Sequence, residues 1–314
     1  MSKPRPATTP SVLRAVANPI LHAGMWPYPA NSIFNPGAAL LADGSTLLLC
    51  RVEDRAGHSH LTAARSADGI STWKIDPSPT LTGDGTPEEC FGIEDPRITR
   101  LDDGRYAVCF TSYGEAGPSV SLAMTTDFAT FDRLGIILPP NNKDAALFPA
   151  KVAGRYAILH RPSCPDAGGG IWIAYSDDLR HWGDHRHVMS ARPAGFWDSA
   201  KIGLAGPTIQ TNDGWLVVYH GVRNTAAGSI YRVGAALLDR NDPCHVVARG
   251  REWFLGPATP DERQGDVADV VFPCGATLIG NELRLYYGMA DTSIGLATVS
   301  LPELLHWLRA SPSE

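Results

Sequence analysis

Residues 101–113 read LDDGRYAVCFTSY, in which a turn built on glycine leads into an alternating apolar and aromatic run. This pattern predicts a turn followed by a half-buried β-strand. It recurs as LADGSTLLLCRV (41–52), VAGRYAILHRP (152–162), NDGWLVVYHGV (212–222) and IGNELRLYYGMA (279–290). The turn glycines are 60, 50, 60 and 66 residues apart, at Gly44, Gly104, Gly154, Gly214 and Gly280. Such spacing is longer than one hairpin needs and fits a repeated unit of four strands.

A second shared element follows most copies, an apolar strand that ends in a small polar turn and an aromatic residue. Its tight versions are LTAARSADGISTW (61–73), VSLAMTTDFATF (120–131) and IWIAYSDDLRHW (171–182). Their aspartates predict turns held by side-chain hydrogen bonds to the backbone. Five such units favour an all-β fold, a five-bladed β-propeller, because radial repetition protects sheet edges. A pair of β-sandwiches is the alternative.

The chain divides into three parts on this interpretation. Residues 1–30 are expected to form an irregular N-terminal arm, and residues 31–300 the propeller. Residues 301–314 are expected to form a short C-terminal helix and tail, because Pro302 suits the first turn of a helix and leucines share one face of LPELLHWLRA (301–310).

Composition limits the classes of function. The chain has 314 residues, 44% hydrophobic and 19% charged, with a formal net charge of −6. A negative balance gives no broad attraction to nucleic acid or to an anionic membrane, so neither partner is expected. The start, MSKPRPATTP, lacks a secretory apolar segment, which predicts a cytoplasmic protein. The six cysteines lack C-x-x-C spacing and are expected to be buried free thiols.

The segment FGIEDPRIT (91–99) carries the sharpest functional signal. Pro96 restricts Asp95 to an extended backbone and so fixes the direction of its carboxylate. A carboxyl group in a partly desolvated channel would have a raised pKa, which suits a general acid. The plainer interpretation is an Asp-Pro turn that pins Arg97.

Basic and phenolic residues from three successive units are expected at the same mouth of the channel. Several cations with a phenol make a plausible clamp for an anion. The sequence has no glycine-rich phosphate loop, no metal-ligand cluster and no G-x-S-x-G nucleophile motif. The candidates are Lys143, Arg161, Lys201, His220 and Tyr231.

These segments resemble glycoside hydrolase family 130, a family of five-bladed propellers that act on β-mannosides. The resemblance runs from about residue 31 to 300. It is carried by FNPGA (34–38), RVEDRAGHS (51–59), GIEDPRIT (92–99), KDAALFPAK (143–151), LHRP (159–162), AGPT (205–208), YHGV (219–222), YRVGAALLD (231–239), VVFPCG (270–275) and YYGMADTSIGLA (286–297).

The resemblance implies an inverting phosphorylase that cleaves a β-1,4- or β-1,2-linked mannoside with inorganic phosphate and gives α-mannose 1-phosphate. Asp95 would be the general acid, acting through the mannose 3-hydroxyl, and the five basic and phenolic candidates would bind phosphate. Phosphate would be a co-substrate, with no cofactor and no metal. Lys143 stands where some members have arginine. The residues expected to bind the sugar are Asn35, Arg51, Asp54, Glu94 and Asp291.

Two other functions stay open. An inverting β-mannosidase of the same family would need a second carboxylate to activate water, whereas phosphate arrives already anionic. A non-catalytic propeller that binds sugar or protein would need no acid in the channel. The acceptor sugar depends on rim loops that the sequence does not resolve, and Trp197 is as compatible with a sugar platform as with packing beneath a loop. Homo-oligomer contacts are possible at the arm and the terminal helix.

Overall fold

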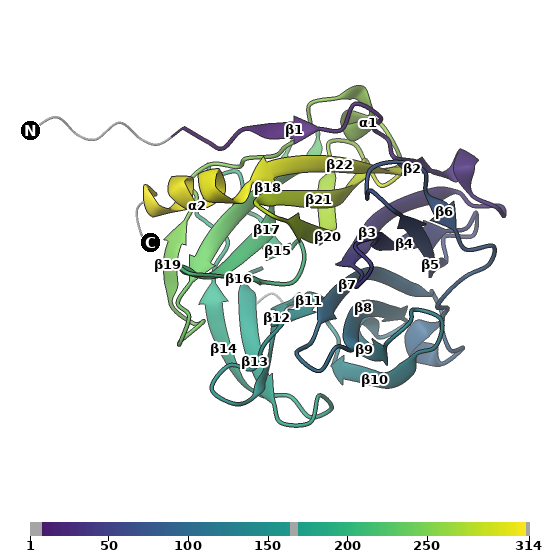
Figure 1. The fold of residues 1–314 in the computed structure, drawn as a ribbon, viewed down its shortest axis with the longest axis horizontal. Helices are drawn as coiled ribbons and strands as arrows, with labels where there is room; N and C mark the ends of the chain where they lie inside the picture. Colours follow the sequence, from purple (N-terminus) through teal and green to yellow (C-terminus); the bar gives the residue numbers. More distant parts are fainter. Residues whose placement is uncertain (1–7, 164–168, 312–314) are drawn as a thin grey trace, which may run out of the picture.

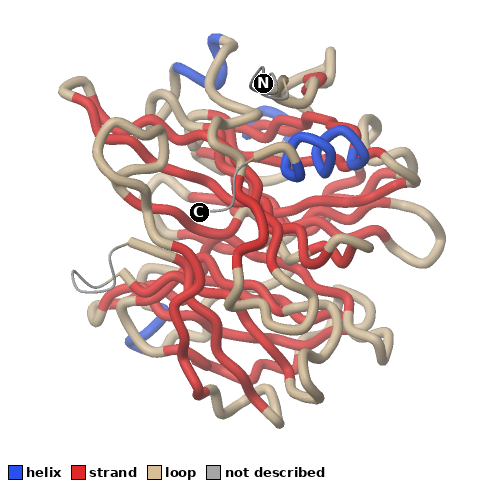
Figure 2. Tube along the Cα trace, turned by 90° about the vertical axis from the view of Figure 1, so that its left-hand side faces the viewer, coloured by secondary structure: helices blue, strands red, loops and turns tan. Residues whose placement is uncertain are grey.

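The computed structural model describes residues 8–163 and 169–311. Five antiparallel sheets lie in a ring, and the first strands of most neighbouring sheets contact one another around its centre (Figure 1). This arrangement confirms the prediction of a five-bladed β-propeller. Strands are the predominant regular structure and helices are few, as Figure 2 shows.

Each blade takes most of its strands from one repeat unit. The first has β3 (Ser32–Leu40), β4 (Thr46–Glu53), β5 (Ser59–Ser66) and β6 (Lys74–Ile75). The second has β7 (Ile93–Arg100), β8 (Tyr106–Gly114), β9 (Gly117–Thr125) and β10 (Asp132–Leu138). The third has β11 (Asn142–Leu147), β12 (Tyr156–Pro162), β13 (Ile171–Ser176) and β14 (Gly183–Met189).

The last two blades each carry an additional short strand. The fourth has β15 (Lys201–Leu204), β16 (Ile209–Thr211), β17 (Gly214–Thr225), β18 (Gly228–Leu238) and β19 (Val246–Arg249). The fifth has β20 (Val271–Ile279), β21 (Glu282–Met289), β22 (Ser293–Ser300), β1 (Val12–Arg14) and β2 (Leu21–His22). The helical segments are η1 (Ala23–Met25), η2 (Pro87–Glu89), α1 (Pro260–Arg263) and α2 (Leu301–Arg309).

The repeated turns form as expected. Gly44 and Gly104 turn the chain between the first and second strands with φ of +85° and +86°, a conformation that glycine adopts without strain. In the outer turns, Asp127 Oδ1 accepts hydrogen bonds from the backbone N–H groups of Ala129 and Thr130. The side-chain-pinned turn is therefore confirmed.

The N-terminal segment closes the ring, which corrects the expectation of an irregular arm. β1 and β2 both pair antiparallel with β22, so residues 12–22 contribute to the fifth blade (Figure 1). Because these strands have only three and two residues, they are too short to show alternating hydrophobicity in the sequence. Each satisfies part of an otherwise open edge of β22.

The predicted C-terminal helix is present as α2. Ser300 accepts a hydrogen bond from the N–H of Glu303, and Leu304, Leu305, Trp307 and Leu308 are buried against the core of the fourth and fifth blades.

Cysteine burial is only partly as predicted. Cys50, Cys109 and Cys274 are buried free thiols, Cys244 is half-buried and Cys90 is exposed. Cys164 lies outside the described residues.

The first strands of three blades share a β-bulge that turns polar side chains toward the centre. The register shifts between Phe34 and Gly37 in β3, between Glu94 and Arg97 in β7, and between Lys143 and Ala146 in β11. The bulged residues have left-handed φ values, namely +46° at Asn35, +50° at Asp95 and +55° at Asp144. The expectation of an extended backbone at Asp95 is therefore wrong, because the bulge overrides the preference of a residue that precedes proline. Bulges re-aim side chains and are frequent beside active sites.

Candidate active site

A cavity of about 190 Å³ lies where the first strands and their loops converge. Nine of the sequence-predicted residues line it, together with Asp144 and three apolar residues. The lining is Asn35, Arg51, Asp95, Lys143, Asp144, Arg161, Lys201, His220, Tyr231, Val267, Val270, Phe272 and Asp291. We call Asn35, Arg51, Asp95 and Asp291 the acid side. We call Lys143, Asp144, Arg161, Lys201, His220 and Tyr231 the cation side.

The acid side is organised around the buried carboxylate of Asp95. Asn35 Nδ2 donates to Asp95 Oδ1 at 2.9 Å, and Arg51 Nη1 donates to the same oxygen at 3.1 Å. Because the guanidinium of Arg51 stacks on Phe34, 4.5 Å from the ring centroid, its position is fixed. Two donors from the first blade therefore hold the carboxylate of the second.

Glu94 and Glu53 surround Arg51 from the outside. Arg51 Nη2 donates to Glu94 Oε1 at 3.0 Å and to Glu53 Oε2 at 3.1 Å. Lys143 Nζ lies 4.0 Å from Glu94 Oε2. Glu94 therefore orients Arg51 and does not line the cavity, so its predicted contact with the sugar has no support from its position.

The expected raised pKa of Asp95 is wrong for the free protein. Burial alone would raise the pKa of Asp95, but Arg51, Lys143 and Arg97, with the Asn35 hydrogen bond, outweigh burial and hold it below the ordinary value. Burial of the carboxyl group follows from its apolar neighbours in the sequence, whereas the cations that lower its pKa come from other strands and are not adjacent to it in the chain.

Asp291 has the raised pKa that was expected of Asp95. Burial, and then the negative charge of Asp95, raise the pKa of Asp291 to about 7. Of the two carboxyl groups on the acid side, Asp95 is thus ionised at neutral pH, whereas Asp291 is close to half protonated.

The cation side comes from the third and fourth blades alone, which corrects the expectation of three units. It surrounds a carboxylate, Asp144, that was not among the predicted residues. Asp144 Oδ2 accepts from Arg161 Nε at 2.8 Å, and Arg161 Nη2 lies 2.7 Å from the same oxygen as an ion pair. Arg97 Nη2 donates to Asp144 Oδ1 at 3.2 Å, and His220 Nε2 lies 3.5 Å from Oδ2. The available signal was its place in the repeat, because Lys143-Asp144 occupies the bulge that Glu94-Asp95 occupies one blade earlier.

The remaining members of the cation side pack around aromatic rings. Lys201 Nζ lies 5.5 Å from the ring centroid of Tyr231, and the ring of His220 lies 4.4 Å from that of Phe272. Burial lowers the pKa of His220 to about 3, so the imidazole is neutral. Burial and the charge of Arg161 also lower the pKa of Lys201, and Asp144 opposes that shift.

Two predicted candidates lie elsewhere. Asp54 Oδ1 accepts from the backbone N–H groups of Ala56 and His58 in the turn between β4 and β5, so Asp54 stabilises a turn outside the cavity lining. Trp197 is 4% exposed, stacks on Tyr219 and donates from Nε1 to the carbonyl of Arg251. Trp197 therefore packs beneath a loop and is not a sugar platform.

Within residues 8–163 and 169–311, no group of three or more His, Cys, Asp or Glu side chains could hold a metal ion. The same part of the chain contains no helix long and apolar enough to cross a membrane.

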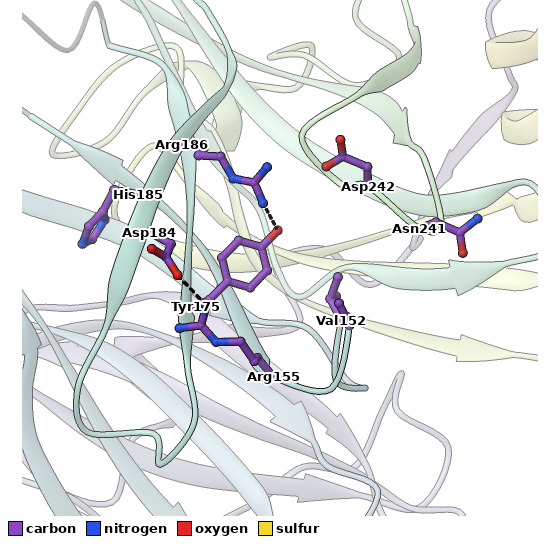
Figure 3. Close-up of a pocket in the computed structure, with 9 residues that line it drawn as sticks. Val152, Arg155, Tyr175, Asp184, His185, Arg186, Asn241 and Asp242 are labelled. Atoms are coloured by element: carbon purple, nitrogen blue, oxygen red, sulfur yellow. Dashed lines mark hydrogen bonds and ion pairs between the residues drawn. The ribbon is translucent and has the colours of Figure 1, made fainter.

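A larger cavity, of about 440 Å³, lies on the exterior between the third and fourth blades (Figure 3). Its two arginines are engaged within the lining. Arg155 pairs with Asp184, and Arg186 Nη2 donates to the hydroxyl of Tyr175 at 3.3 Å. Because its cations are already neutralised or stacked on Tyr175, this cavity offers a weaker anion site than the channel mouth.

Comparison with known proteins agrees with the geometry. The sequence model of glycoside hydrolase family 130, described as beta-1,4-mannooligosaccharide phosphorylase, matches residues 17–310. A 1,2-beta-oligomannan phosphorylase of Thermoanaerobacter sp. (strain X514) is 38% identical over 87% of this chain and 91% of its own length. A beta-1,4-mannooligosaccharide phosphorylase of Ruminococcus albus is 34% identical over 98% of this chain and 94% of its own.

A solved structure gives the same result. The beta-1,2-mannobiose phosphorylase of Listeria innocua, in complex with beta-1,2-mannobiose, superposes with a TM-score of 0.87 at 33% identity and covers 96% of this chain and 100% of the other. The match of the family model over most of the chain and the identity to these relatives lead to one conclusion: this chain belongs to glycoside hydrolase family 130.

Proposed function

We propose that this protein is an inverting phosphorylase that cleaves a β-1,2- or β-1,4-linked mannoside with inorganic phosphate and releases α-mannose 1-phosphate. The observation that carries the proposal is the sharing of one cavity by a buried aspartate, Asp95, and the cluster of Lys143, Arg161 and Lys201. The relatives named above are phosphorylases of β-mannosides of both linkages, which supports the same substrate class here.

In this proposal Asp95 supplies the proton to the leaving sugar. An oxygen of the phosphate dianion attacks the anomeric carbon of the mannosyl unit from the face opposite the glycosidic bond. That bond breaks, and its oxygen takes a proton that Asp95 supplies through the mannose 3-hydroxyl. The proton carried by phosphate is released when the ester forms and restores the acid, so the reaction needs no cofactor and no other co-reactant.

Binding of phosphate changes the protonation of Asp95 in the required direction. Lys143 is one of the charges that lower the pKa of Asp95 in the free protein. A bound dianion on the cation side offsets that charge and adds its own negative field, and both effects raise the pKa of Asp95. A sugar that excludes water from the acid side increases the shift. Both effects favour the protonated form of the acid in the loaded site, where it is used.

The hydrolytic alternative needs a carboxylate base to activate water, and the cavity offers two candidates. The pKa of Asp144 is held well below its usual range, because the charges of Arg161 and Arg97 outweigh the effect of burial, so Asp144 is a weak base. Asp291, whose pKa is raised to about 7, is the stronger base of the two and is the group that a hydrolase would use. The cations that face these groups suit an anionic nucleophile better than water.

The test is sugar release from β-1,2- and β-1,4-mannobiose with and without inorganic phosphate, with α-mannose 1-phosphate measured directly. We expect release to require phosphate and to yield the sugar phosphate in equal amount. Equal release without phosphate contradicts the proposal and supports the hydrolase. No release with either linkage, together with unchanged ligand binding in Asp95→Asn, supports a non-catalytic propeller.

A further inference from the structure

The presence of a permanently charged carboxylate among the cations of an anion site needs an explanation. Asp144 is 1% exposed and accepts hydrogen bonds from two arginines. Its negative charge repels phosphate by Coulomb's law, so its presence weakens binding unless it does something that outweighs the repulsion. Its contacts indicate what that is.

Asp144 fixes the orientation of the Arg161 guanidinium. Arg161 presents Nε and Nη2 side-on to Asp144 Oδ2, and Nη1 donates to Ser163 Oγ at 2.8 Å. The two hydrogen bonds and the ion pair engage all three nitrogens of the guanidinium. A guanidinium has five N–H donors, so donors on the terminal nitrogens remain for the oxygens of a phosphate.

The backbone is shaped to bring Asp144 and His220 together. Asp144 reaches its position from a β-bulge with a left-handed φ of +55°. On the facing strand, Gly203 leaves the space that both side chains occupy. A Cβ at Gly203 would clash with Asp144 Oδ2 and would lie 2.6 Å from His220 Cε1. The close approach of the carboxylate to the imidazole thus depends on a missing side chain.

Arg97 anchors the strand of the acid through two backbone carbonyls, besides the bond from Arg97 Nη2 to Asp144 Oδ1. Arg97 Nη1 donates to the carbonyl of Asp95 at 2.9 Å, and Arg97 Nη2 donates to the carbonyl of Leu204 at 2.9 Å. These two bonds do not involve Asp144, so loss of its charge leaves the strand of Asp95 anchored. A change at Asp144 is therefore expected to act on phosphate and not on the mannosyl group.

From these contacts we infer that Asp144 is a positioning residue for phosphate: it holds Arg161 and His220 so that their remaining polar groups converge on the anion. This inference rests on the proposed function, because it assigns a role within the same site. It predicts that, for phosphate binding, the orientation that Asp144 gives to Arg161 matters more than the repulsion between Asp144 and the anion. Asp144→Asn makes the cavity more positive, and simple electrostatics predicts tighter phosphate binding, whereas the positioning role predicts weaker binding.

The experiment measures KM for phosphate, KM for the mannoside and the rise in melting temperature that added inorganic phosphate produces. For Asp144→Asn we expect KM for phosphate to rise roughly 10- to 100-fold, since bonds to a charged partner are lost, while KM for the mannoside stays within about twofold. The phosphate needed for a given thermal shift should rise in the same proportion.

Two further variants separate positioning from stability. Asp198→Asn also removes the charge of a buried carboxylate, but one that does not line the cavity. Asp198 Oδ2 accepts from Arg249 Nη2 at 2.6 Å and from the hydroxyl of Tyr219. This variant should lower the melting temperature without changing the ratio of the two KM values. Gly203→Ala keeps every charge and displaces Asp144 from His220. It should raise KM for phosphate several-fold, whereas Gly183→Ala, which meets open space, should not.

The outcomes are distinguishable. If the wild-type protein releases sugar without phosphate, the proposed function fails before any variant is compared. If the wild type needs phosphate but Asp144→Asn binds it equally well or more tightly, the positioning role is overturned and Asp144 only balances charge. If Asp144→Asn does not fold, an unchanged KM for phosphate in Gly203→Ala overturns the inference by itself.

Discussion

The two halves of the cavity have opposite charge distributions. On the acid side two carboxyl groups, Asp95 and Asp291, face the single guanidinium of Arg51. On the cation side several basic groups face one carboxylate, Asp144. The minority charge in each half is the group that makes most of the contacts. In each half, therefore, the single group of opposite charge, Arg51 or Asp144, holds the other buried groups in place. A substitution in one half can be compared with a substitution in the other.

The largest effect is expected on the acid side. Asp95→Asn keeps the shape of the side chain, and its carbonyl oxygen can still accept from Asn35 and Arg51. It cannot supply the proton to the leaving oxygen, so kcat for phosphorolysis should fall by roughly 10²- to 10⁴-fold. Release of α-mannose 1-phosphate measures the rate. Mannoside binding, followed by calorimetry, should persist, and a kcat within tenfold of the wild type would show that Asp95 is not the acid.

The second effect breaks the cation side while keeping its charge. Arg161→Lys retains a cation but loses the side-on pair of bonds to Asp144. The ammonium group of lysine lacks the planar set of donors that lets a guanidinium bind a carboxylate and two phosphate oxygens together. KM for phosphate should therefore rise about 10- to 100-fold, with little change in KM for the mannoside. Arg155→Lys in the exterior cavity is the matched control (Figure 3). Equal kinetics in Arg161→Lys and the wild type would mean that charge alone suffices.

The same comparison explains what could be predicted from the sequence. The blades were predictable because each repeat contains a turn glycine, such as Gly44 or Gly104, closely followed by the apolar run of a strand. It was not predictable that the pKa of Asp291 lies above that of Asp95, because the pKa of Asp95 is lowered by Arg51, which comes from another blade. Asp144 was missed because a carboxylate beside Lys143 reads as a local ion pair, whereas its partners Arg97 and Arg161 are 47 and 17 residues away.

A smaller effect, on stability, is expected from Asp291. Its pKa rises from 3.8 to about 7 on folding, so between these values the folded protein binds a proton that the unfolded chain does not. Its contribution to the free energy of unfolding therefore falls as pH rises from about 4 to about 7 and levels off above. Asp291→Asn removes this cost. The melting temperature of the variant minus that of the wild type should increase from pH 5 to pH 7.5, and a constant difference would contradict the raised pKa.

The smallest effect should come from Asp54, which lies outside both halves of the cavity. Its carboxylate accepts two backbone hydrogen bonds at 2.8 and 3.0 Å in a solvated turn. Asp54→Ala should therefore cost less than about 1 kcal/mol in the free energy of unfolding, because water replaces both bonds. The kinetic constants for phosphate and mannoside should stay unchanged. A rise in KM for the mannoside would instead place the turn between β4 and β5 against the bound sugar, and would extend the acid side beyond the cavity lining.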